Sequence, residues 1–131
     1  PQRAEAEAKL SVGGYAEAVI RMMILLADAR GAVRRSRLAR SNKLLTTEAP
    51  FAEMTAAERM ATIRDQTMIA TLFPEEAIQS LTVLLPNAAL RRKALHAVET
   101  VAGPDEELGD NARMRLERLR EVLAVRPQRA A

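Results

Sequence analysis

The sequence contains no cysteine, which excludes disulfide bonds and thiolate metal sites. Only three residues are aromatic, Tyr15, Phe51 and Phe73, so leucine, methionine, isoleucine, valine and alanine must fill the core. Most of these are good helix formers, and few stretches are rich in β-branched residues. The composition therefore predicts an all-α fold.

Long apolar runs are also missing. The longest, residues 18–27, is interrupted by Arg21 and has about half of the ~20 residues that a membrane span needs. No signal-peptide pattern opens the chain. We therefore expect no membrane span and a cytoplasmic location. The chain lacks an initiator methionine, which we interpret as excision from a longer protein.

The chain has 131 residues, of which 48% are hydrophobic and 28% charged, as is typical of one globular domain. We expect residues 1–14 to be a linker or a frayed helix, 15–125 a single helical domain, and 126–131 a tail. The pattern of apolar residues and helix-stop signals predicts a compact bundle of about six helices, over residues 15–30, 33–46, 55–72, 74–85, 88–102 and 110–123.

Several helix ends carry local signals. Thr55 and Glu58 have the spacing of a capping box, and Pro74 suits the first turn of a helix. Gly31 and Gly103 are expected to end helices, and Asp110 to cap the last one. The helix over 15–30 is apolar on nearly every side, which is typical of a central helix. We expect its most deeply buried residues to be Val19, Met22, Met23 and Leu26.

The segments 27–33 and 102–108 align as the turns of a weak internal repeat. Each turn joins an apolar helix to an amphipathic one, which suggests two helical hairpins packed face to face. Chance similarity between helical hairpins explains the same pattern.

That arrangement resembles the TerB-like domain of tellurite-resistance proteins, in which two such hairpins carry acidic turns. Asp28, Gly31 and Val33 match part of the turn, whereas Arg37 stands where the family has a glutamate. The resemblance implies a metal-responsive domain, and the candidate ligands are Asp28, Asp105, Glu106, Glu107 and Asp110. Because those residues lack EF-hand spacing, solvated turns and helix caps explain them too.

Three strings resemble the C-terminal helical region of an uncharacterised bacterial family whose main domain is similar to α/β-hydrolases and polyhydroxyalkanoate synthases. They are GGYAEAVIRMMILLADARG (13–31), FPEEAIQSLTVLLP (73–86) and RRKALHAVETVAG (91–103). The resemblance implies an accessory domain attached to a larger hydrolase-like protein.

Nothing in the sequence has the pattern of a catalytic site. There is no Gly-x-Ser-x-Gly motif and no phosphate-binding loop, and Ser80 has no histidine nearby in sequence. His96 is the only histidine, and pairing with Glu99 or Arg92 explains it better than a metal site. We therefore expect no enzymatic activity and no cofactor.

Arginines crowd the second predicted helix, and we expect a basic surface there. Its residues are Arg30, Arg34, Arg35, Arg37, Arg40 and Lys43. Nucleic-acid binding would follow from such a surface, but the net charge is only +3 and few aromatic residues are available to stack on bases.

Residues 51–85 contain more apolar residues than the inward face of a helix needs. We expect an exposed patch made of Phe51, Met54, Phe73 and Val83, which contacts the parent hydrolase-like domain or a second copy of the chain. The sequence thus favours a non-catalytic protein-interaction or regulatory module. Nucleic-acid binding by the arginine-rich helix and a metal-responsive TerB-like role are the alternatives.

Overall fold

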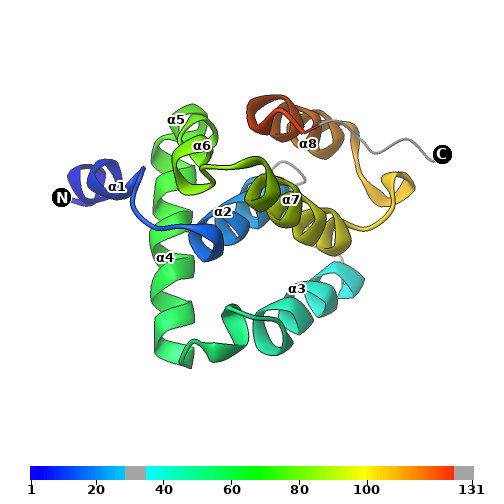
Figure 1. Ribbon diagram of the computed structural model, residues 1–131, viewed down its shortest axis with the longest axis horizontal. Helices are drawn as coiled ribbons and strands as arrows, with labels where there is room; N and C mark the ends of the chain where they lie inside the picture. The colour runs from blue at the N-terminus through cyan, green and yellow to red at the C-terminus, as the bar shows by residue number, and fades with distance from the viewer. Residues whose placement is uncertain (29–34, 126–131) are drawn as a thin grey trace.

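Helix α2 (Tyr15–Asp28) lies at the centre of the fold and is surrounded by other helices (Figure 1). The computed structural model describes residues 1–28 and 35–125; the side chains of Asp28, Arg35 and Asp105 are outside the description. Helix α2 packs against α4 (Ala56–Leu72), α5 (Pro74–Gln79), α6 (Leu81–Leu84), α7 (Ala88–Ala102) and α8 (Asp110–Leu123).

The remaining elements lie outside this central group. Helix α1 (Gln2–Lys9) packs on α4, and α3 (Arg35–Thr47) packs mainly on α7 and on the short 3-10 helix η1 (Phe51–Glu53). A second 3-10 helix, η2 (Asp105–Glu107), precedes α8. Every element in the described ranges is helical, which confirms the expected all-α bundle.

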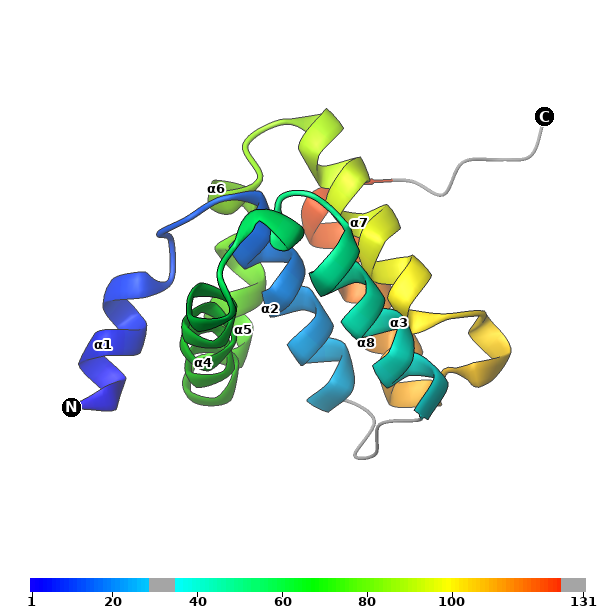
Figure 2. The same ribbon diagram turned by 90° about the horizontal axis from the view of Figure 1, so that it is seen from below.

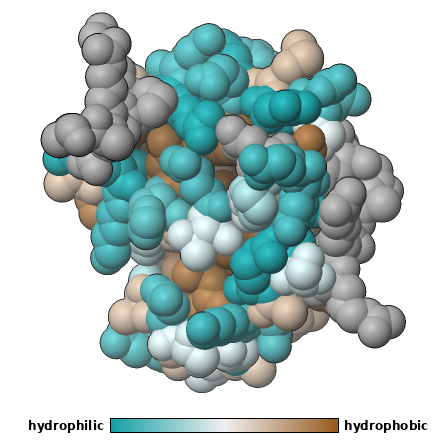
Figure 3. Space-filling model, turned by 90° about the vertical axis from the view of Figure 1, so that its right-hand side faces the viewer, coloured by the Kyte–Doolittle hydropathy of each residue, from teal (hydrophilic) through white to brown (hydrophobic). Residues whose placement is uncertain are grey.

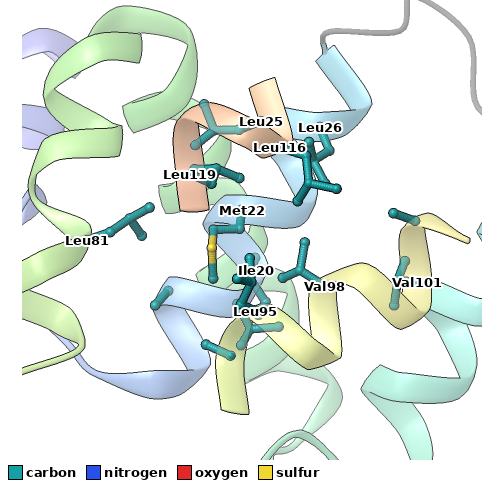
Figure 4. Packing of buried hydrophobic residues seen from close by; sticks show 14 of the residues in the cluster. Ile20, Met22, Leu25, Leu26, Leu81, Leu95, Val98, Val101, Leu116 and Leu119 are labelled. Carbon is teal, nitrogen blue, oxygen red and sulfur yellow. The ribbon is translucent and has the colours of Figure 1, made fainter. Parts of the chain in front are cut away.

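The main core forms where α2 meets α7 and α8. Side chains of Met22 and Leu25 lie among those of Leu95, Leu116 and Leu119 (Figure 4). Val19, Met22 and Leu26 are buried as predicted, whereas Met23 is only half-buried because it lines a groove described below. Full burial of a leucine in such a core contributes about 2 kcal/mol.

Local sequence signals account for four helix ends. The Thr55 hydroxyl accepts from the Glu58 amide, and the Glu58 carboxylate accepts from the Thr55 amide, so the predicted capping box is formed. The same hydrogen bonds lower the pKa of Glu58. Pro74 begins α5, and the Asn87 side chain caps α7 by accepting from the Leu90 amide. Gly103 ends α7 with a φ of 84°.

Three local expectations need correction. Residues 2–9 form a helix, which was one of the two expected alternatives, but this helix is packed rather than frayed, because Ala6 is buried with Ile69 and Ala77. The helix expected over 74–85 is divided at Ser80 into α5 and α6. Gly109, not Asp110, is the N-cap of α8, and no side chain caps that end. The expected helix end at Gly31 and the tail 126–131 lie outside the described residues.

Arg21 lies completely buried on α2 and joins three other segments. Its Nε donates to Gln66 Oε1 of α4 at 2.7 Å, and its Nη2 donates to the Leu10 carbonyl at 2.9 Å. Its Nη1 donates to the Ala77 carbonyl and to Ser80 Oγ. Burial lowers the pKa of Arg21 to about 10, an effect that the charge of Glu17 partly offsets. The one charged residue in the apolar run is therefore a hydrogen-bonded hub.

Helix length and composition bear on membrane insertion. Across residues 1–28 and 35–125, none of the helices combines the length and the apolar character that a crossing requires. This finding agrees with the sequence expectation.

Candidate binding groove

An apolar groove of about 190 Å³ separates α3 from α2 and α4. On α2, residues spaced three, four and seven apart share the helix face that forms its floor. Residues of α3 and α4 form the sides, and Val101 of α7 closes it. The lining residues are Ile20, Met23, Ile24, Ala27, Arg37, Leu38, Ser41, Leu45, Ile63 and Val101.

The groove exists because of the way α3 is held. Helix α3 rests on α7 and on η1, where the fully buried Phe51 is inserted into the core. Viewed from below in Figure 2, α2 lies between α4 on one side and α3 on the other. Between these two outer helices, four apolar residues of α2 line the groove: Ile20, Met23, Ile24 and Ala27.

Leu38 lies at the rim of this groove. Its side chain is 62% exposed. Leu45, two turns further on, is half-buried and also lines the groove. An exposed leucine beside an apolar hollow is a feature of binding sites, whereas isolated exposed leucines are ordinary.

Arg37 is the only charged residue among the described residues of the lining, and it is 7% exposed. Its Nε donates to the Ala102 carbonyl over a long 3.3 Å. Its Nη2 is shielded from water and has no hydrogen-bond partner in the described part of the chain. Burial, and then the nearby charge of Arg40, lower the pKa of Arg37, whereas Glu107 raises it. An unsatisfied buried donor of this kind is costly.

Arg40 lies one turn along α3 and secures the end of α7. Its Nε donates to the Val101 carbonyl at 3.0 Å, and its Nη2 donates to the Ala102 carbonyl at 3.4 Å. The same Nη2 pairs with Glu107 at 3.2 Å. These contacts satisfy carbonyls that a helix end leaves without intrahelical partners.

The expected basic surface therefore needs correction. Arg37 is buried and Arg40 is half-buried against α7, because the free carbonyls of a helix C-terminus attract cationic donors. Lys43 is exposed as expected. Arg30 and Arg34, and the side chain of Arg35, lie outside the described residues. Two of the six basic residues on which the nucleic-acid hypothesis depends, Arg37 and Arg40, are therefore packed against α7 and do not form an open basic surface.

The four residues of the expected interaction patch are not brought together. Phe51 is fully buried, so it cannot be a surface contact; Val83 is 57% exposed. Met54 is half-buried against the core, and Phe73 is half-buried under Arg3, whose guanidinium lies 4.6 Å from the ring centre. Met54 and Phe73 flank the 17-residue helix α4, which is about 25 Å long. Figure 3 shows hydrophobic atoms recessed among hydrophilic ones on one face.

Two of the five candidate metal ligands form ion pairs. Glu107 pairs with Arg40, and Asp110 pairs with Arg113 at 2.7 Å. Glu106 is exposed, and the side chains of Asp28 and Asp105 are outside the description. The described residues contain no group of three or more histidine or acidic side chains that could hold a metal ion.

Sequence reasoning missed the groove and the roles of both buried arginines. The signal for Arg21 was its position as the only charge within residues 18–27. No comparable signal marked Arg37, because five other basic residues surround it in the segment 30–43.

Comparison with known proteins identifies no relative, so a functional conclusion has to rest on the site itself. No family model, curated protein or solved structure matches the chain. The described fold and site define an all-α domain with a small apolar groove, which has a buried arginine in its wall.

Proposed function

We propose that this chain is a non-catalytic regulatory module, attached to a larger hydrolase-like protein, that binds its ligand in the groove between α2, α3 and α4. The groove carries this proposal, because it combines a nearly continuous apolar lining with a single buried cation. Ligand sites commonly have this composition, with few polar groups in an apolar hollow.

The surroundings of Ser80 support the non-catalytic part of the proposal. Its hydroxyl donates to the Glu76 carbonyl at 2.7 Å and accepts from Arg21 Nη1 at 2.8 Å. A nucleophilic serine instead gives its proton to a general base. The hydrogen bonds of Ser80 thus hold the junction between α5 and α6.

The relation to TerB-like domains is a second part of the proposal. We propose that α2–α3 and α7–α8 are two related hairpins. Val19, Met23 and Leu26 of one apolar helix fall opposite Ala94, Val98 and Val101 of the other. The support for the repeat is that five of these six residues are buried, and Met23 is half-buried. The acidic turns then serve as ion-pair partners, as Glu107 and Asp110 do, rather than as metal ligands.

The binding part can be tested with Nile red, a neutral dye that fluoresces in apolar surroundings. We expect the chain to raise its fluorescence, and Ser41→Phe to abolish that rise, because Ser41 lines the groove. Asn42→Phe is the matched control, since Asn42 is exposed on the same helix and does not line the groove. Equal signals from both variants would overturn the assignment of the groove.

The same purified chain should not hydrolyse p-nitrophenyl esters. Turnover that disappears in Ser80→Ala would contradict the non-catalytic assignment, provided that circular dichroism shows the variant to be folded.

A further inference from the structure

Arg37 has hydrogen-bonding capacity that the described residues leave unused. Arginine carries five N–H donors and remains charged at neutral pH. Of these donors, the Nε group reaches Ala102 over 3.3 Å, while Nη2 has no acceptor within the described residues. The nearest acidic group that influences Arg37, Glu107, pairs with Arg40 instead. Arg37 is thus a buried cation that lacks an anion of its own.

The residues around Arg37 restrict the kind of molecule that could bring an anionic group to it. Of the ten described residues that line the groove, eight are apolar and the other two are Arg37 and Ser41. A hydrated or strongly polar ligand would lose its water contacts there without replacement. An aliphatic chain gains from burial in the same place, by about 0.8 kcal/mol for each CH₂ group.

The size of the groove sets a further limit. Its 190 Å³ lies below the roughly 300 Å³ at which pockets for drug-sized ligands begin. This volume suits a short unbranched chain better than a nucleotide or a large cofactor. Among the described residues of the wall, Arg37 is the single charged one, which matches a singly charged head group better than a phosphate.

We propose that the groove binds a medium-chain aliphatic carboxylate, with its chain along α2 and its carboxylate on the Arg37 guanidinium. This inference rests on the proposed function and adds the chemical class of the ligand. The carboxylate accepts charge-assisted hydrogen bonds, which are about twice as strong as neutral ones. Because the groove is apolar, these bonds are little screened by water.

Binding requires a small movement of Arg37, since Nη2 is shielded from water before the ligand enters. The guanidinium turns toward the groove and gives up its long bond to the Ala102 carbonyl. That carbonyl keeps Arg40 Nη2 as a donor at 3.4 Å, so no acceptor is left unsatisfied. Arg40 thus frees Arg37 to serve the ligand.

Competition between octanoate and Nile red tests the proposal on the whole chain. We expect octanoate to displace the dye at about tenfold lower concentration than octanol, which has the same chain but no charge. Arg37→Met should raise the apparent Kd for octanoate about tenfold and leave dye binding in place. Lys43→Met is the control, because it removes a charge from the exposed side of the same helix.

The outcomes separate this inference from the proposed function. If Nile red binds in the groove and octanoate and octanol displace it equally, the groove is a binding site but the carboxylate assignment is wrong. If neither dye nor octanoate binds, both proposals fail. A dimer in sedimentation analysis that Ser41→Phe converts to a monomer would show that a second copy fills the groove, which also overturns the ligand assignment.

Discussion

Two arginines lie inside this fold, and their surroundings differ sharply. Arg21 on α2 donates to four acceptors, supplied by α4, α5, Ser80 and the segment after α1. Arg37 on α3 donates to one, and its Nη2 has none among the described residues. Both side chains are more than nine-tenths buried. Hydrogen bonds therefore offset the cost of burying the Arg21 charge, whereas the cost of burying the Arg37 charge is offset by a single long hydrogen bond.

This difference separates a structural region from a candidate binding region. A buried charge stabilises a fold only when its hydrogen bonds are satisfied. Arg21 meets that condition and links α1, α2, α4 and α5. Arg37 does not, and it lies in the wall of the groove.

The comparison predicts that Arg21→Met has the largest effect. Methionine keeps an unbranched apolar stem but leaves the Leu10 and Ala77 carbonyls and Gln66 Oε1 without this donor. We expect the free energy of unfolding to fall by about 4 kcal/mol, measured by urea denaturation. A loss below about 1 kcal/mol would show that Arg21 is not a structural hub.

Most of the fold follows from patterns that are local in sequence. The capping residue Thr55, the first-turn proline Pro74 and the terminating Gly103 mark helix ends that the structure confirms. The apolar character of residues 15–28 likewise identified the central helix. Such signals act within one or two helical turns, so they can be recognised in the sequence without knowledge of tertiary contacts.

Tertiary contacts decided the features that could not be predicted. Helix α1 has little apolar surface, yet Ala6 becomes buried because α4 and α5 supply the matching surface. On α3, Arg37 is buried and Leu38 is exposed, the reverse of what polarity suggests. The C-terminal carbonyls of α7 cause this reversal. The sequence of residues 35–47 does not indicate that those carbonyls lie beside α3, so the candidate site could not be predicted from the sequence.

An intermediate effect is expected for Gly103→Ala, which strains the turn that supports α3. Gly103 has φ 84° and ψ −172°, a conformation that is essentially restricted to glycine. An added Cβ would also lie 2.5 Å from Arg40 Nη2, so Arg40 would have to shift. We expect a loss of about 2 kcal/mol in thermal or urea unfolding. Gly109→Ala is the comparison variant: nothing lies within 4 Å of its Cβ position, so it should lose only the weaker N-cap preference of alanine, about 0.5 kcal/mol.

The smallest change in the free energy of unfolding is expected for Arg37→Met. This variant therefore gives the most direct comparison with Arg21→Met. The substitution removes one 3.3 Å hydrogen bond, and Ala102 keeps Arg40 as a donor. It also removes an unsatisfied buried donor, which is a gain in stability. We therefore expect the free energy of unfolding to change by about 1 kcal/mol or less. Urea denaturation should show this near-neutral result beside the large loss for Arg21→Met. A loss as large as that of Arg21→Met would make Arg37 a structural residue and remove the main reason to assign it to a ligand.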